Sequence, residues 1–137
     1  MDEICEAIER QRNKTPALTT WEEIEDVAIS DPRVSTHSGT TRKTWVGDHV
    51  VLTRAVVKAN SVGKPHRHEA EQVSMILRGR VLVTLEGRQF EAGAGSIVFV
   101  PRNAVHMFQI LDEETELLDA YGLKDSAAEL AKEYPGT

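Results

Sequence analysis

The sequence PHRHEAEQVSMILRG at residues 65–79 decides the fold of this chain more than any other stretch. It holds His66 and His68, which lie two residues apart, and Gln72, which follows four residues later. In an extended strand, side chains at even spacing point to the same face, so all three would face one way. Gly79, at the end of the stretch, allows a tight turn into the next strand. These residues predict a strand that carries potential metal ligands on one face.

A second stretch, GSIVFVPRNAVHMFQI at residues 95–110, adds a third histidine. Gly95 precedes a short apolar run typical of a buried strand, Pro101 opens a loop, and His106 follows five residues later. Where neighbouring strands bring the two stretches together, three imidazoles and one amide meet. Imidazole is a borderline ligand that suits Zn, Fe, Ni, Cu and Mn. We therefore expect one divalent transition metal ion, bound by His66, His68, Gln72 and His106.

Outward from these stretches, the chain reads as a series of short strands from about residue 34 to residue 122. The strands are rich in β-branched residues, and glycine and proline mark the turns between them. Many short strands without long helices between them indicate a sandwich or a barrel. The expected strands cover residues 49–57, 71–77, 80–86, 96–100 and 116–121.

Both ends of the chain are predicted to be helical. Near the N-terminus, Thr20 and Glu23 form a Ser/Thr-x-x-Glu capping pattern, and apolar residues at helical spacing continue to residue 28. Ser126 and Glu129 repeat the capping pattern near the C-terminus. The expected fold is therefore all-β with short N-terminal and C-terminal helices. It divides into a helical extension at 1–33, a β-barrel at 34–123, and a C-terminal helix and tail at 124–137.

Composition and charge exclude several classes of function. The formal net charge of −6 does not suit a protein that tracks nucleic-acid phosphates, which needs an excess of Lys and Arg. No apolar run in the sequence reaches the roughly 18–20 residues of a membrane span. The single cysteine, Cys5, allows neither an internal disulfide nor a Cys-rich zinc module. Because the first residues are acidic where a signal peptide would be basic, we expect a cytoplasmic protein.

The two histidine stretches resemble the two sequence motifs of the cupin superfamily, usually written G-x5-H-x-H-x3,4-E-x6-G and G-x5-P-x-G-x2-H-x3-N. The resemblance covers about residues 42–122 and implies a jelly-roll β-barrel with a metal ion at its mouth. The matching positions are His66, His68, Gln72 and Gly79 in the first motif and Gly95, Pro101 and His106 in the second.

The sequence departs from these motifs at several positions. Asn60 and Asn103 stand where the motifs have glycine, and Ile110 stands where the second motif ends in asparagine. Gln72 replaces the usual glutamate. Four neutral ligands would leave a divalent ion with its full charge, which makes it a stronger Lewis acid. Glu71 is a rival ligand, but strand alternation turns it to the opposite face.

The run ELLDAYGLKD at residues 116–125 resembles the small single-domain cupins of pectin and alginate breakdown, which help to convert 4,5-unsaturated uronates to their open-chain keto form. That resemblance implies catalytic roles for Asp119 and Tyr121 and a substrate contact for Lys124. Tyrosine and lysine stand here where that group has phenylalanine and arginine. Arg54 lies mid-strand, so its side chain faces either water or the barrel interior, where it would clamp a substrate carboxylate.

Three hypotheses follow from these residues. The leading one is a metal-dependent isomerase, lyase or hydrolase, in which the metal acts as a Lewis acid on a small enolisable carbonyl compound, such as a uronate, and Asp119 moves the proton. The second is a non-haem iron, or other metal, dioxygenase, because three-histidine cupins resemble enzymes that cleave quercetin and diketones. The third is a non-catalytic module that binds a metal or a sugar. All three take a small-molecule partner without nucleic acid or membrane, and unpaired strand edges favour a homodimer.

Overall fold

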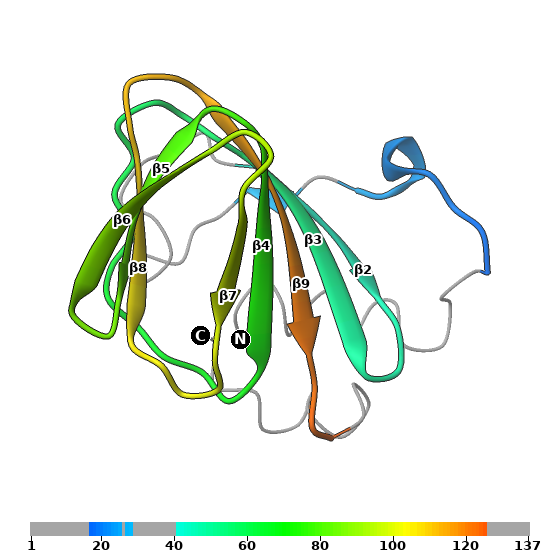
Figure 1. The fold of residues 1–137 in the computed structure, drawn as a ribbon. Helices are drawn as coiled ribbons and strands as arrows, with labels where there is room; N and C mark the ends of the chain where they lie inside the picture. Colours follow the sequence, from blue (N-terminus) through cyan, green and yellow to red (C-terminus); the bar gives the residue numbers. More distant parts are fainter. Residues whose placement is uncertain (1–16, 26, 29–40, 126–137) are drawn as a thin grey trace.

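The computed structural model of the chain describes residues 17–25, 27–28 and 41–125. These residues form nine strands and one short 3-10 helix (Figure 1). In chain order the elements are η1 (Trp21–Glu23), β1 (Val27–Ala28), β2 (Thr41–Val46), β3 (Val50–Val57), β4 (Glu71–Arg78), β5 (Arg80–Leu85), β6 (Arg88–Gly93), β7 (Ile97–Val100), β8 (His106–Ile110) and β9 (Thr115–Gly122).

The strands form two antiparallel sheets that face each other. The larger sheet has the order β1-β2-β3-β9-β4-β7, and the smaller one has the order β6-β5-β8. Figure 1 shows the smaller sheet on the left and the larger one on the right. Neighbours such as β9 and β4 are distant in sequence, so the chain crosses repeatedly between the sheets. The all-β prediction is confirmed, and the topology is that of a jelly roll.

Side-chain alternation places the core between the sheets. The strands β2 and β9 alternate strictly between buried and half-buried positions, as a strand with one buried face should. Burying one such apolar side chain contributes about 1.5–3 kcal/mol relative to leaving it in water. The cluster that fills one part of the interior comprises Ile76, Val81, Val83, Ala92, Val98, Val100, Ala104, Ile110 and Leu117.

The helix predicted to begin at Thr20 is wrong. The chain forms only the 3-10 turn at Trp21–Glu23, and the Thr20 side chain makes no capping hydrogen bond. Ile24 is already extended, with φ −93° and ψ 129°. Val27–Ala28 then forms β1, which pairs with β2. The backbone hydrogen bonds that β1 gains by pairing with β2 stabilise the extended chain more than the local capping pattern stabilises a helix. Residues 1–16 of the expected helical extension and the C-terminal helix expected from Ser126 lie outside the described residues.

Several strands were not predicted individually because their sequences are polar. In β6 the first four residues, Arg88–Glu91, are exposed, so no apolar alternation marks this strand. In β2, with the sequence TRKTWV, the first four residues are polar or charged, although every second residue of the strand is buried. The larger sheet also includes β1, within the segment predicted as a helical extension.

The asparagines that replace the motif glycines adopt the backbone conformation that glycine usually provides. Asn60 has φ 66° and Asn103 has φ 61°. Asparagine is among the few residues with side chains that enter this left-handed region readily. The turn at Asn103 also allows its backbone N–H to donate to the His68 carbonyl oxygen at 2.8 Å. These departures from the motif therefore preserve the turn geometry.

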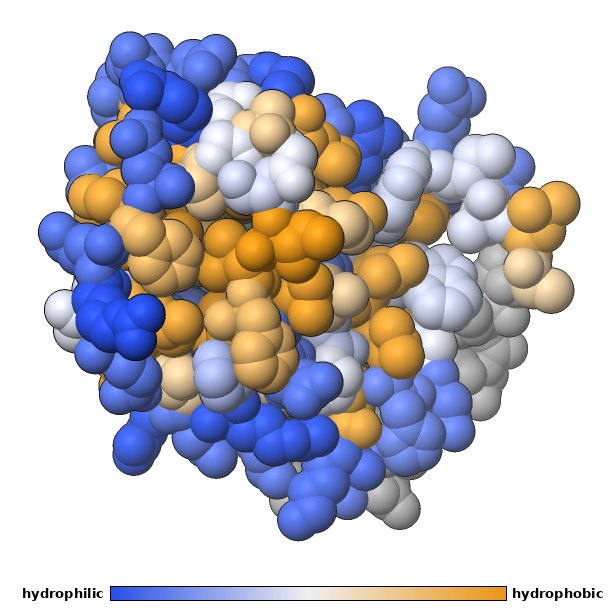
Figure 2. All heavy atoms as spheres, viewed as in Figure 1, coloured by the Kyte–Doolittle hydropathy of each residue, from blue (hydrophilic) through white to orange (hydrophobic). Residues whose placement is uncertain are grey.

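One outer face of the larger sheet is apolar. Ile97 and Phe99 on the edge strand β7 are 69% and 52% exposed. Figure 2 shows apolar residues gathered over the region of β7 and β4. Among the described residues, no helix is long and apolar enough to cross a membrane.

Gly79 provides a test of the turn between β4 and β5. A Cβ at this position, where φ is +91°, would collide with the Thr115 hydroxyl. Gly87 has a similar φ of +78° but open space around it. Both alanine substitutions carry the left-handed strain of about 1–2 kcal/mol, and only Gly79→Ala adds a collision. We expect urea unfolding to show a clearly larger loss of stability for Gly79→Ala than for Gly87→Ala. Equal losses would contradict this packing.

Candidate metal centre

The histidines of the two motifs meet where the segment before β4 pairs with the start of β8. His66 and His68 lie in the segment that leads into β4, not on a regular strand, and His106 begins β8. The backbone N–H of His66 donates to the His106 carbonyl at 3.0 Å, and the N–H of His106 donates back at 2.9 Å. This two-residue bridge ties the segment before β4 to the opposite sheet.

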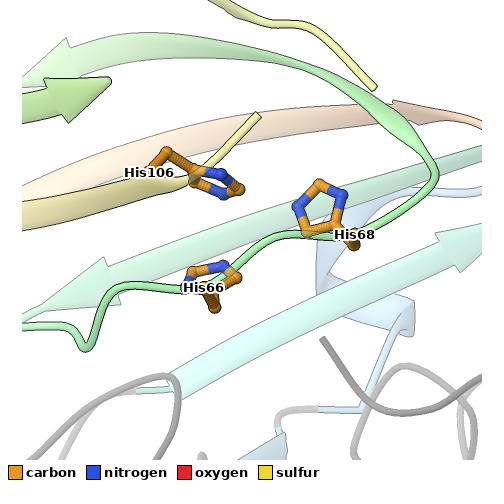
Figure 3. A group of neighbouring side chains, drawn as sticks. All are labelled: His66, His68 and His106. Atoms are coloured by element: carbon orange, nitrogen blue, oxygen red, sulfur yellow. The ribbon is translucent and has the colours of Figure 1, made fainter. Parts of the chain in front are cut away.

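The three imidazoles converge on one point. Figure 3 shows the rings of His66, His68 and His106 turned toward a common space. One nitrogen from each ring lies within 4.8 Å of the other two. The ring centroids are 4.3 Å apart for His66 and His106, 4.9 Å for His68 and His106, and 5.7 Å for His66 and His68. Three histidines this close together can hold a metal ion.

Hydrogen bonds to the backbone fix which nitrogen of each ring faces that space. In all three rings Nδ1 lies beside a carbonyl oxygen two residues away along the chain, at 2.8 Å for His66, 2.7 Å for His68 and 2.9 Å for His106. Because a carbonyl oxygen only accepts, each Nδ1 carries a proton. A neutral ring then presents its lone pair at Nε2, which is how a backbone carbonyl orients a metal-binding histidine.

Burial keeps two of these rings neutral. It lowers the pKa of His68 and lowers the pKa of His106 to about 4, and the neighbouring His66 adds to both shifts. At neutral pH both rings are therefore uncharged. The Nε2 atom of His106 is buried and has no hydrogen-bond partner in the described part of the chain. A buried acceptor without a donor is unusual in proteins and fits a metal-ligating nitrogen.

Gln72 completes the set of candidate ligands. Its side chain, 5% exposed, places Oε1 3.0 Å from His68 Nε2. Since His68 Nδ1 carries the proton of the neutral ring, two lone pairs face each other across this distance. A shared cation would stabilise that arrangement. Three imidazole nitrogens and an amide oxygen therefore fit a divalent transition metal.

Comparisons with known proteins agree with this geometry. A family model described as a cupin domain matches residues 53–121, half of the chain. The chain belongs to the cupin domain family. A comparison with curated proteins gave no match.

Several solved structures share the cupin fold of this chain. KdgF from a Halomonas species has a TM-score of 0.68 and 20% identity, over 80% of this chain and 96% of its own. The polyketide cyclase RemF from Streptomyces resistomycificus has a TM-score of 0.67 and 24% identity, over 80% of this chain and 81% of its own. A predicted oxalate decarboxylase from Thermotoga maritima has a TM-score of 0.69 and 18% identity, over 77% of this chain and 98% of its own. At these identities the similarity establishes the fold alone.

A chain of hydrogen bonds orients the Gln72 amide in this cupin. The amide nitrogen of Gln72 donates to Ser74 Oγ at 2.8 Å, and the Ser74 hydroxyl donates to Asp119 Oδ1 at 2.5 Å. With its nitrogen held by Ser74, the amide turns its oxygen toward His68. All three side chains are buried. Ser74 therefore links the candidate metal ligand Gln72 to the buried carboxyl of Asp119.

Asp119 and Tyr121 both face the barrel interior from β9. Burial raises the pKa of the Asp119 carboxyl, while the Ser74 hydrogen bond and the charge of Arg42 act in the opposite direction. The Tyr121 ring stands edge-on to His68, with centroids 5.8 Å apart. The structure thus brings both predicted catalytic residues beside the ligand cluster.

The two predicted substrate contacts lie elsewhere. Arg54 is on the outward side of β3, where Nε and Nη2 bind the Glu116 carboxylate at 3.1 and 3.2 Å. Lys124 is exposed just beyond the end of β9. Of the two alternatives for Arg54, the structure thus favours the outward-facing one. Glu71, the rival ligand, is exposed.

Ser74 and Arg42 are the interior residues that our sequence analysis missed. Ser74 shares the parity of Gln72 on β4, two residues further on, which was the available signal. Arg42 and Thr44 share the buried face of β2. Arg42 was missed because that strand was not predicted. The Thr44 and Thr53 hydroxyls lie 3.2 Å apart, so polar contacts continue across the inner face of the larger sheet.

Removing single histidines tests the metal centre. We expect His66→Ala, His68→Ala and His106→Ala each to lower the metal bound per chain several-fold, because each removes one ligand of a chelate. The control is His49→Ala, which removes a half-exposed histidine outside the cluster. Metal content measured by mass spectrometry on dialysed protein reads the result. Equal metal content in all four variants would rule out this centre.

The hydrogen-bond chain predicts a coupled pair of substitutions. In Gln72→Glu, the Ser74 hydroxyl lies between two carboxyl groups and can donate its one proton to only one of them. The other buried group loses its hydrogen-bond donor, which costs about 1–3 kcal/mol or more. Adding Asp119→Asn supplies an N–H on the other side of Ser74, so the chain can run in reverse with every bond made. We expect urea unfolding of the metal-free protein to show the double variant more stable than Gln72→Glu alone. Strictly additive effects would refute the coupling.

Proposed function

We propose that this cupin is a metal-dependent enzyme of the isomerase, lyase or hydrolase type, acting on a small enolisable carbonyl compound such as a uronate. One observation carries the proposal: a cluster of neutral metal ligands shares a buried hydrogen-bond chain with a carboxyl group, Asp119. A Lewis-acid site and a proton-transferring group in one barrel are what such reactions require.

His66, His68, Gln72 and His106 would hold the metal, which would polarise a substrate oxygen without any redox change. Because all four ligands are neutral, they would compensate none of the positive charge of the ion. A Zn, Fe, Ni, Mn or Cu ion would be compatible with the ligand set.

Asp119 would accept the proton from carbon next to the polarised carbonyl. Burial raises its pKa, and a carboxylate of higher pKa is the stronger base. The Ser74 hydroxyl fixes the orientation of the carboxylate. Tyr121, edge-on to the His68 ring, would bound the space in which the substrate lies.

The substrate class rests on two weaker supports. One is the sequence similarity of residues 116–125 to cupins that act on unsaturated uronates. The other is the structural similarity to KdgF. Two further structures of this fold are named as enzymes, a polyketide cyclase and a predicted oxalate decarboxylase, which supports a catalytic role but not a particular substrate. The homodimer and the cytoplasmic location stay predictions.

An anaerobic assay tests the proposed chemistry. The metal-loaded protein should convert unsaturated uronates under argon as fast as in air, because no oxygen is consumed. Asp119→Asn should abolish turnover with the metal content intact, since an amide cannot accept the proton. The control is Asp48→Asn, which changes an exposed aspartate outside the site and should retain activity.

Two outcomes would contradict the proposal and point to the alternatives. Turnover that stops under argon and consumes O₂ in air would indicate a metal-dependent dioxygenase. A fully metal-loaded protein without turnover across a panel of uronates and other enolisable carbonyl compounds would indicate a non-catalytic binding module.

A further inference from the structure

Two buried side-chain nitrogens in the described residues have no hydrogen-bond partner: His106 Nε2 and Arg42 Nε. Most buried polar atoms in proteins are paired, so each exception asks for a physical reason. The proposed metal accounts for His106 Nε2. Arg42 carries a charge that proteins cannot remove by deprotonation, so it needs a different explanation.

Arg42 lies inside the barrel. It occupies an inward-facing position of β2, and its side chain is only 8% exposed. Across the sheet it is opposite Ala55, whose small side chain leaves room for a long neighbour. Within the described residues its guanidinium forms neither an ion pair nor a hydrogen bond. Burying such a charge is costly, so retaining it is unfavourable unless an anion binds there.

Asp119 does not serve as that anion by direct contact. It lies one inward-facing position along the strands from Arg42, opposite Thr53 on β3. Its carboxyl is bonded to Ser74, and it feels the charge of Arg42 only at a distance. The guanidinium donors therefore stay available for an anion that enters the barrel.

We propose that Arg42 is the anion-binding residue of the barrel and holds a carboxylate of the substrate. This rests on the proposed function, because it places a carboxylate-bearing substrate in the same interior as the metal ligands. The planar guanidinium matches a carboxylate through two parallel N–H···O bonds. With neutral metal ligands, the loaded interior has an excess of positive charge, so an anionic substrate is favoured over a neutral one of similar shape.

This assignment gives Arg42 the role that the sequence had left open for Arg54. The two arginines lie on neighbouring strands, Arg42 on β2 and Arg54 on β3. Arg54 pairs with Lys43, a residue on the outward face of the sheet. Arg42 precedes Lys43 by one residue, so it lies on the inward face. Arg54 is held by Glu116, whereas Arg42 Nε is buried without a hydrogen-bond partner in the described part of the chain. The pair therefore offers a buried arginine and a matched outer control.

Calorimetric titration of the zinc-loaded full chain tests the proposal. The probes are D-galacturonate and D-galactose, which has a hydroxymethyl group in place of the carboxylate. We expect galacturonate to bind at least about tenfold more tightly, a difference near 1.4 kcal/mol. Arg42→Met should remove this preference with zinc content unchanged, while Arg54→Met should keep it.

A second variant covers the case in which Arg42→Met does not fold. Arg42→Lys keeps the charge and loses the planar fork, so galacturonate should bind several-fold more weakly than to the original chain. An undiminished preference in either folded Arg42 variant, or no preference in the original chain, would overturn the proposal. Zinc content measured on the same samples separates failure of the metal site from failure of the anion site.

Discussion

The two backbone hydrogen bonds between His66 and His106 are the contact on which the site depends. They join the segment before β4 to the first residue of β8, which belongs to the other sheet. The same segment is also held along β8 by hydrogen bonds from the Gly63 N–H to the Phe108 carbonyl and from the Ile110 N–H to the Ser61 carbonyl. The Asn103 turn reinforces it, because its N–H bonds the His68 carbonyl. The site is thus built from backbone geometry first and side chains second.

Polar side chains inside the larger sheet extend the site beyond the histidines. Gln72, Ser74 and Asp119 form one buried chain of hydrogen bonds, and Ser74 can serve both neighbours only if one of them donates to it. This gives a physical reason for an amide at position 72 in place of the usual glutamate. A buried carboxyl nearby and a carboxylate ligand at that position would compete for a single hydroxyl proton. The choice of an amide ligand at position 72 therefore depends on the buried carboxyl of Asp119.

The sequence predicted the features that short periodic patterns encode. Histidine spacing identified the ligand cluster, and β-branched runs gave five of the strands with small errors at their ends. The sequence could not show which sheet face a residue occupies when its strand is not recognised. Because β2 is too polar to be found by apolar alternation, the inward position of Arg42 was missed. The helix expected from Thr20 failed because pairing of Val27–Ala28 with β2 overrides a local capping pattern.

X-ray absorption spectroscopy of the zinc-loaded chain tests the central claim, a single metal ion held by residues of both motifs, most directly. The structure predicts one zinc per chain with three imidazole nitrogens at about 2.0–2.1 Å and an additional oxygen ligand. Its spectrum should show the outer-sphere scattering of three imidazole rings. A spectrum with one imidazole or none, or zinc bound only by oxygen, would contradict the account.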